Sequence, residues 1–275
     1  MTPKPPWHGP HAADQTQRPD PSGSTRCGAR SPGRHPTLTS SETAAELVAQ
    51  AQAVLLDFDG PICSVFAGYR AHEVAAEIMK RAAAAGYALR PDDSDDPISV
   101  YKATTGMDPD VIAVVEDALV EEASTALSRT EPHPGIPDRV RQLHTAGHRL
   151  VIVTNNGGGR VSAFINRHGL ADQVEKVIGR DARRPSLLKP SPDSILRALA
   201  YLDLPPEHGV FVGDSTSDVD AGHAAGLPVV GYANKPGKDQ RLRDAGADAI
   251  ITSMGDLVLT LRPRTLRPCP AAGDA

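Results

Sequence analysis

The chain is poor in aromatic residues, which make up only 4% of it, and a large stacking pocket for a nucleobase is therefore not expected. No apolar run approaches the roughly 18 residues that a membrane-spanning helix needs. Positive charge is not in excess either: the net charge is −5, which argues against nucleic acid as the main partner. The three cysteines, Cys27, Cys63 and Cys269, include no close pair that would suggest a zinc site or a disulfide framework. These absences together predict a cytoplasmic protein with neither a nucleic acid nor a membrane as its partner.

The most informative feature that is present is a pair of carboxylates directly after a short apolar run. Residues 53–56, Ala-Val-Leu-Leu, are typical of a strand buried inside a parallel sheet, and Asp57-Phe58-Asp59-Gly60 follows. Residues i and i+2 of an extended chain point the same way, so Asp57 and Asp59 are expected to project together, while Gly60 permits a sharp bend. Two such carboxylates repel each other unless a cation binds or one of them keeps its proton. Either condition suits phosphoryl transfer, and a simple acidic turn is the alternative.

Three later segments carry the other groups that such chemistry needs. Thr154 and Asn155 follow a second apolar run, and a hydroxyl, an amide and backbone N–H groups there can hold phosphate oxygens. Lys189 can neutralise a phosphate. Asp214 and Asp218 follow a third apolar run, and carboxylates suit Mg²⁺, which takes oxygen ligands. Each segment alone is also compatible with a turn, a surface charge or a loop, but their shared placement at strand ends favours one site.

In this order the segments resemble the four motifs of the haloacid dehalogenase-like superfamily of phosphohydrolases. The resemblance covers about residues 50–260 and is closest to the phosphoglycolate-phosphatase-like branch, whose helical cap is inserted directly after the first motif. Pro61 departs from the pattern, since Thr, Val or Ala is more usual there, and it concerns the start of the cap rather than the catalytic carboxylates. The dehalogenase branch lacks an Asp at the position of Asp59, which argues against carbon–halogen cleavage.

The resemblance implies a catalytic role for four residues. Asp57 would be the nucleophile that forms an aspartyl-phosphate intermediate. Asp59 would protonate the leaving group and then activate water. Thr154 and Lys189 would bind the transferring phosphoryl group.

The resemblance also implies bound Mg²⁺. Its ligands would be the side chain of Asp57, the backbone carbonyl of Asp59, the carboxylate of Asp214 and, through water, Asp218.

Substrate contacts are expected from two residues of the core motifs, Gly60 and Asn155, and from two basic residues of the cap. Arg70 and Lys102 could meet a carboxylate or a second phosphate of the substrate, although each could equally be an ordinary surface charge. A small phosphorylated metabolite fits the composition better than a nucleotide.

The remaining pattern predicts an α/β fold. Strands and helices alternate after residue 131, which indicates a doubly wound parallel sheet, a Rossmann-like core whose ligands bind beyond the carboxyl ends of the strands. Residues 61–130 are mostly helical in pattern and predict an inserted helical cap domain, with residues 91–97 as a solvated acidic connection. The core would then comprise residues 41–60 and 131–261. Residues 1–40 predict a disordered segment, because they nearly lack aliphatic side chains, and residues 262–275 predict a flexible tail.

The sequence therefore predicts an enzyme, a Mg²⁺-dependent phosphatase of a small phosphomonoester, acting as a monomer or homodimer. Two alternatives stay open: a phosphomutase of the same superfamily, and a non-catalytic regulatory module on this fold.

Overall fold

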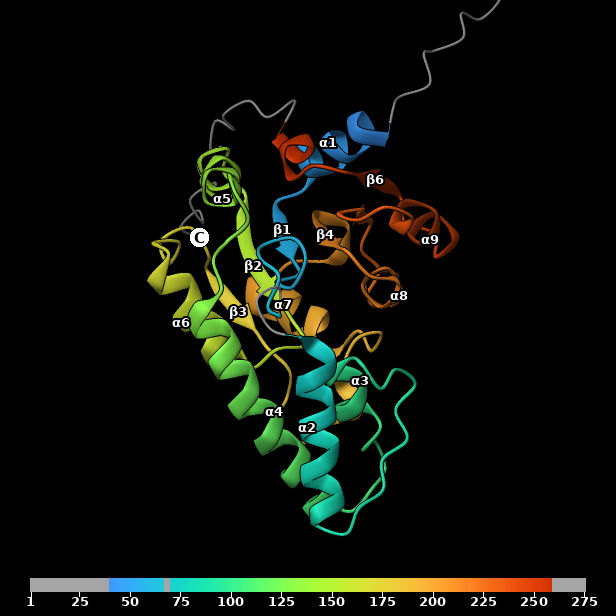
Figure 1. Cartoon of the computed structure of the whole chain (residues 1–275). Helices are drawn as coiled ribbons and strands as arrows, with labels where there is room; N and C mark the ends of the chain where they lie inside the picture. Colours follow the sequence, from blue (N-terminus) through green and yellow to red (C-terminus); the bar gives the residue numbers. More distant parts are fainter. Residues whose placement is uncertain (1–39, 67–69, 259–275) are drawn as a thin grey trace, which may run out of the picture. The chain divides into compact units, whose positions relative to one another are not determined.

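The computed structural model describes residues 40–66 and 70–258 (Figure 1). The segment 1–40, except for Ser40, and the tail 262–275 lie outside these residues, so the predictions of disorder and flexibility concern parts of the chain that are not described. No helix in the described ranges is long and apolar enough to cross a membrane.

Six parallel strands form one sheet in the order β3-β2-β1-β4-β5-β6. They are β1 (Ala53–Leu56), β2 (Arg149–Val153), β3 (Lys176–Ile178), β4 (Gly209–Gly213), β5 (Val229–Tyr232) and β6 (Ala249–Ile251). Leu55 of β1 lies between Val151 of β2 and Phe211 of β4. The chain extends the sheet to one side of β1 and then returns to extend it on the other, so the strand order reverses between β1 and β4. Open α/β sheets bind ligands at such a reversal, beyond the carboxyl ends of the strands.

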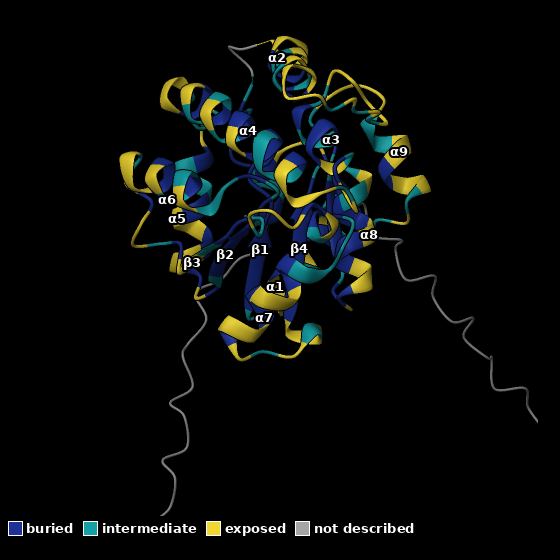
Figure 2. Cartoon of the chain, turned by 90° about the horizontal axis from the view of Figure 1, so that it is seen from below, coloured by how far each residue is buried: buried dark blue, intermediate teal, exposed yellow. Residues whose placement is uncertain are grey.

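Helices cover both faces of the sheet, which confirms the doubly wound arrangement. One face carries α1 (Ser40–Gln50), α5 (Ile136–Thr145) and α6 (Gly158–Arg167), and the other carries α7 (Asp193–Leu202), α8 (Thr216–Ala224) and α9 (Lys238–Asp244). Because side chains alternate along a strand, Val54 and Leu56 pack in the first apolar cluster, whereas Ala53 and Leu55 pack in the second. Figure 2 shows the buried strands at the centre and the exposed residues on the outer sides of the helices.

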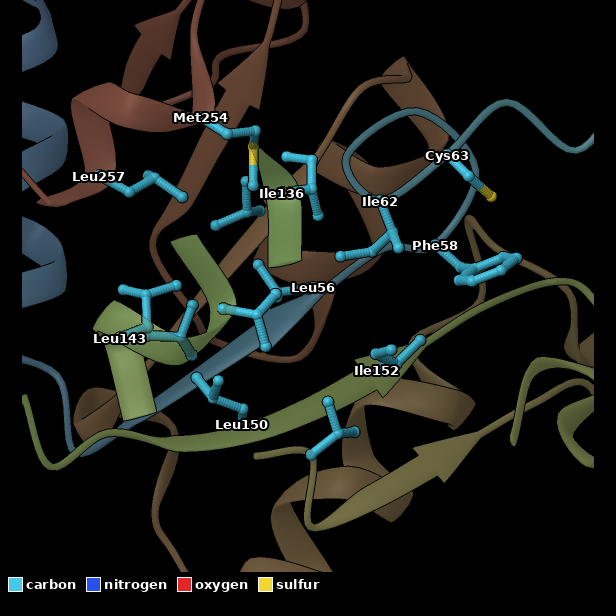
Figure 3. Close-up of a cluster of buried hydrophobic side chains, with 14 of the residues drawn as sticks. Leu56, Phe58, Ile62, Cys63, Ile136, Leu143, Leu150, Ile152, Met254 and Leu257 are labelled. Atoms are coloured by element: carbon cyan, nitrogen blue, oxygen red, sulfur yellow. The ribbon is translucent and has the colours of Figure 1, made fainter. Parts of the chain in front are cut away.

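Apolar packing under the end of β1 fixes the backbone that carries the two aspartates. Figure 3 shows the side chains that the strands share with α5 and the 3₁₀ helix η3 (Met254–Val258), among them Leu56, Leu143, Leu150, Ile152 and Met254. Phe58 is fully buried and meets Phe164 of α6 edge-on, with ring centroids 5.0 Å apart. Burial of one large apolar side chain contributes about 1.5–3 kcal/mol. Phe58 therefore holds the chain in place between Asp57 and Asp59.

The described residues between β1 and α5 contain three helices, here called the cap helices: α2 (Ala71–Ala84), α3 (Pro97–Lys102) and α4 (Pro109–Arg129). They bury an apolar cluster of their own, to which Leu188 from the core segment also contributes. In Figure 1, α2 and α4 lie side by side, beyond the carboxyl ends of the strands. The inserted helical segment is thus present, while the domain boundaries at residues 61 and 130 stay a prediction.

Two short helices differ from the expectation. No separate helix was predicted at residues 97–102 or at residues 238–244, where α3 and α9 lie. Helix α3 begins because the Asp96 carboxylate accepts hydrogen bonds from the N–H groups of Ile98 and Ser99, each at 3.0 Å, and Pro97 occupies the first turn. Six or seven residues give too few positions for a helical period to be visible in the sequence.

Candidate active site

The residues singled out in the four motifs converge on one cavity of about 350 Å³ at the carboxyl ends of the strands. Asp57 follows β1, Thr154 follows β2 and Asp214 follows β4, while Lys189 lies on the loop after the 3₁₀ helix η1 (Pro185–Leu187). The lining residues include Asp57, Asp59, Thr154, Asn155, Asn156, Lys189, Asp214, Ser215, Ser217 and Asp218. The structure therefore brings together side chains from positions that span more than half of the chain.

Lys189 lies between two buried carboxylates. Its Nζ is 2.7 Å from Oδ1 of Asp57 and 2.5 Å from Oδ1 of Asp218. Burial disfavours the charged ammonium, but Asp218 and Asp57 outweigh burial and raise the pKa of Lys189, so this residue stays a cation. Burial also raises the pKa of the Asp57 carboxyl, and the Lys189 ammonium opposes that rise. A further cation beside Asp57 would favour the anionic form that a nucleophile needs.

Asp218 uses both of its oxygens within the protein. Oδ1 faces Lys189, and Oδ2 accepts hydrogen bonds from the N–H groups of Asp214 and Ser215 and from the Ser215 hydroxyl. Ser215 in turn accepts a hydrogen bond from the N–H of Asp218, and the reciprocal pair forms a capping box at the start of α8. Asp218 therefore shapes the loop that follows β4 and holds Lys189.

A divalent cation fits next to Asp57 and Asp214. Ligand oxygens of Asp57, Asp214 and Asp218 lie within 4.8 Å of one another, and oxygen ligands suit Mg²⁺. Among the described residues, Oδ1 of Asp57 accepts a hydrogen bond from Lys189, and Oδ2 of Asp214 contacts Asn234 and Lys238. One oxygen of Asp57 and one of Asp214 are left for a metal.

Asp59 lies in the same cavity but in a different environment. Its Oδ1 accepts a hydrogen bond from the N–H of Val65 at 3.0 Å, and its carboxylate is not a member of the three-residue cluster described above. Burial raises the pKa of Asp59 to about 6, although the Val65 hydrogen bond lowers it. A carboxyl that keeps its proton at mildly acidic pH can serve as a general acid.

Gly60 is needed for the bend between the aspartates and the cap. Its φ is +117°, and a Cβ at this position would lie 2.3 Å from the carboxyl carbon of Asp214. Any side chain at Gly60 would displace Asp214. The sharp bend is confirmed, while the expected substrate contact of Gly60 stays a prediction.

The loop after β2 positions both phosphoryl-binding candidates. Oγ1 of Thr154 accepts a hydrogen bond from the N–H of Asn156 at 3.0 Å. Oδ1 of Asn155 accepts one from the N–H of Lys189, also at 3.0 Å. The Asn155 side chain thus holds the backbone of Lys189. The spacing of the two residues in the sequence does not indicate this role.

Of the two basic cap residues, only one reaches the cavity. Lys102 lines it, whereas Arg70 lies before α2, is largely exposed, forms an ion pair with Glu73 and is not among the lining residues. The acidic residues Asp92, Asp93 and Asp96 also line the cavity. Their loop was interpreted as a solvated connection, but it forms the cap side of the site.

Further residues near the site were not predicted. Asn234 and Lys238 contact Asp214 from the segment after β5, and the only signal was their position after a strand of the same sheet.

Cys63 is buried in the first apolar cluster, and burial raises its pKa. It is therefore a packing residue and not a reactive thiol.

Comparison with known proteins gives a consistent picture. The sequence model of the haloacid dehalogenase-like hydrolase family matches residues 94–232. A phosphoglycolate phosphatase of Cupriavidus necator is 35% identical over 139 residues, 49% of this chain and 58% of that protein. One from Nitrosococcus oceani is 31% identical over 134 residues, 48% of this chain and again 58% of that protein. The matched segments thus span little more than half the length of these relatives.

Solved structures resemble the whole arrangement. A structure from Clostridium acetobutylicum, described as a predicted phosphatase, has a TM-score of 0.60 at 19% identity and covers 76% of this chain and 96% of that one. CbbY of Rhodobacter sphaeroides, solved with xylulose-1,5-bisphosphate, has a TM-score of 0.54 at 23% identity and covers 74% and 95%. These likenesses show the fold. With a family match over half of its length and the fold of that family, the chain belongs to the haloacid dehalogenase-like hydrolases.

Proposed function

We propose that this chain is a Mg²⁺-dependent phosphatase that hydrolyses a small phosphomonoester through an aspartyl-phosphate on Asp57. The proposal rests on one contact at the strand-order reversal: Oδ1 of Asp57 lies 2.7 Å from Nζ of Lys189. The segment that matches the family begins at residue 94. The roles proposed for Asp57 and Asp59 therefore rest on the geometry of the site and on the resemblance of their motif to the first motif of the family.

The first chemical step follows from the positions of the two aspartates. A carboxylate oxygen of Asp57 attacks phosphorus, and the bond from phosphorus to the leaving oxygen breaks. Asp59 gives its proton to that oxygen, so the leaving group departs as an alcohol. Lys189 and the hydroxyl of Thr154 neutralise and orient the phosphoryl oxygens.

The second step returns the enzyme to its starting state. Asp59, now anionic, takes a proton from water as that water attacks the phosphorus of the aspartyl-phosphate. The acyl-phosphate bond breaks, Asp57 is regenerated and inorganic phosphate leaves. The buried position of Asp57 limits access of water to the intermediate.

Asp57 and Asp214 would hold the Mg²⁺, with the backbone carbonyl of Asp59 and, through water, Asp218 as the other ligands. The ion would supply positive charge that offsets the repulsion between the carboxylates and the phosphate. The raised pKa of Asp57 supports this requirement, because burial alone favours its neutral form.

The substrate is a small phosphorylated metabolite. The cavity, at about 350 Å³, lies at the small end of the range for ligand sites, and the curated relatives are named phosphoglycolate phosphatases. Contacts of Gly60, Asn155 and Lys102 with the substrate, a cytoplasmic location and a monomeric or homodimeric state belong to the same proposal. Arg70 lies outside the cavity and has no part in it.

A phosphate-release screen over phosphorylated metabolites, with Mg²⁺ and with excess chelator, tests the function. Asp57→Asn is the matched control: it should fold as the wild type does and lose turnover by several orders of magnitude, because an amide is not an anionic nucleophile. Full activity in chelator, or wild-type turnover by the folded variant, would refute the mechanism. Activity that depends on a bisphosphate activator and releases no phosphate would instead identify a phosphomutase.

A further inference from the structure

Arg180 is a buried cation at the junction between the cap helices and the core. It follows β3, and its side chain is 2% exposed, while that of Glu116 in α4 is 7% exposed. The guanidinium donates two hydrogen bonds to the Glu116 carboxylate, at 2.8 and 3.1 Å. It also lies over the ring of Tyr101 in α3, 5.4 Å from the centroid. Arg180 therefore contacts two of the three cap helices.

The same guanidinium also reaches the phosphoryl-binding loop. Its Nη1 donates a hydrogen bond to the carbonyl of Asn155 at 3.2 Å, and its backbone N–H donates to the carbonyl of Asn156 at 3.1 Å. Asn155 in turn accepts a hydrogen bond from the N–H of Lys189. A continuous series of contacts thus runs from Glu116 through Arg180 and Asn155 to Lys189.

Arg180 is not among the residues that line the cavity, and its side chain is directed at Glu116 and the Asn155 carbonyl instead. A buried ion pair adds little net stability compared with apolar side chains of similar size, because both charges lose their hydration. A guanidinium offers what an apolar residue cannot: several N–H donors in a fixed planar geometry. At this junction these donors meet a cap carboxylate and a core carbonyl at once.

We infer that Arg180 is a positioning residue, which with Glu116 fixes the Asn155 loop to the cap helices and thereby sets the place of Lys189. This inference rests on the proposed function, because it assigns a task to the loop that would bind the phosphoryl group. A displacement of about 1 Å in such groups can lower the rate by about 10²-fold.

The test separates positioning from simple structural support. Arg180→Gln leaves Glu116 buried and unpaired, so this variant should be strongly destabilised. The double variant Glu116→Gln/Arg180→Gln removes both charges and should recover most of the stability in urea unfolding. It still lacks the guanidinium that holds Asn155. We therefore expect it to bind inorganic phosphate in the presence of Mg²⁺ about 10-fold or more weakly than the wild type, with a matching loss of kcat on an aryl phosphate.

Arg167 provides the matched control. Its Nη2 donates to the carbonyls of Leu127 and Thr130, at 2.7 and 2.9 Å, and so joins α6 to the end of α4 without touching the Asn155 loop. Arg167→Gln should lower stability and leave phosphate affinity and kcat unchanged. Arg180→Lys keeps the charge opposite Glu116 but lacks the planar set of donors, and it should restore stability more than phosphate affinity.

Two outcomes would overturn the inference: wild-type phosphate affinity and kcat in the double variant, or an equal loss of phosphate affinity in Arg167→Gln. Failure of the proposed function has a different signature. If the wild type released no phosphate from any ester, the phosphatase assignment would fall, while the measured affinity for inorganic phosphate would still decide the role of Arg180.

Discussion

At the scale of single residues, burial favours the protonated form of Asp59. Asp59 has a folded-state pKa of about 6, above its ordinary value of 3.8. The folded protein therefore binds more protons than the unfolded chain between these values. The contribution of Asp59 to stability is fully present below pH 3.8 and is lost as the pH rises through about 6.

In the metal-free protein, Asp59→Asn should show how much stability is lost when the Asp59 carboxyl ionises. The amide resembles the protonated acid, so the variant should match the wild type in stability near pH 4 and exceed it at pH 7. The gain has an upper bound of about 3 kcal/mol. Urea unfolding at a series of pH values measures it, and a stability difference that stayed constant with pH would contradict the assignment.

Asp214 and Asp218 should respond differently to the same substitution. Asp214→Asn should fold normally and need a higher Mg²⁺ concentration, because one ligand oxygen loses its charge. Asp218→Asn should instead lose about 2–4 kcal/mol of stability, since it caps α8 and pairs with buried Lys189. Calorimetric titration with Mg²⁺ and urea unfolding of both variants separate the two roles, and identical behaviour would show that the roles are shared.

The sequence revealed those residues whose chemistry is tied to a strand end. Asp57, Thr154 and Asp214 were found because each follows an apolar run, and parallel strands bring such positions to one edge of the sheet. Asn234, Lys238 and Arg180 were missed, because their importance comes from contacts that only the folded chain creates. A lysine next to a loop proline looks the same in a sequence whether it meets water or a carboxylate.

At the scale of elements, the acidic loop before α3 places carboxylates on the cap side of the cavity. Asp92 and Asp93 line the cavity, and both are exposed. Together with Asp96 they would face the phosphorylated substrate proposed above, which is itself an anion. Charge on the far end of the substrate therefore matters for the rate of capture.

Neutralising this loop should favour substrates that carry a second negative charge. We expect Asp92→Asn/Asp93→Asn to raise kcat/KM for phosphoglycolate about 3- to 10-fold relative to glycerol 3-phosphate at low salt, and less at high salt. Asp95→Asn, in the same loop but not at the cavity, is the control and should leave the ratio of the two kcat/KM values unchanged at low and at high salt. An unchanged ratio in the double variant would exclude the loop from substrate selection.

The same scale shows which elements a sequence pattern can predict. An apolar run was expected to end just before Thr154, and β2 ends there at Val153, because Leu-Val-Ile-Val is buried on both faces and has no other stable environment. α3 and α9 were missed because they are short and depend on their surroundings. In α3 these are the Asp96 cap and the burial of Tyr101 against α2 and α4.

At the scale of the whole molecule, metal binding should stabilise the fold. The proposed Mg²⁺ would join the ends of β1 and β4, so it would bind the folded state and would have no comparable site in the unfolded chain. At 100 times its dissociation constant it should add about 2.7 kcal/mol to the free energy of unfolding. Thermal unfolding of chelator-treated protein with and without Mg²⁺ measures this. Asp214→Asn should show a smaller shift, and a wild-type midpoint unaffected by Mg²⁺ would contradict a site between these strands.

The strand order has one more consequence, which concerns synthesis on the ribosome. Ala53 at the start of β1 pairs with Arg149 on one side and Gly209 on the other. At a synthesis rate of about 5–20 residues per second, the first strand that pairs with β1 is made about 5–20 s after it, and the second is made later. The cap helices, which pack mostly against one another, can form during that interval. The central strand therefore remains exposed to chaperones and to aggregation while the cap helices are being synthesised.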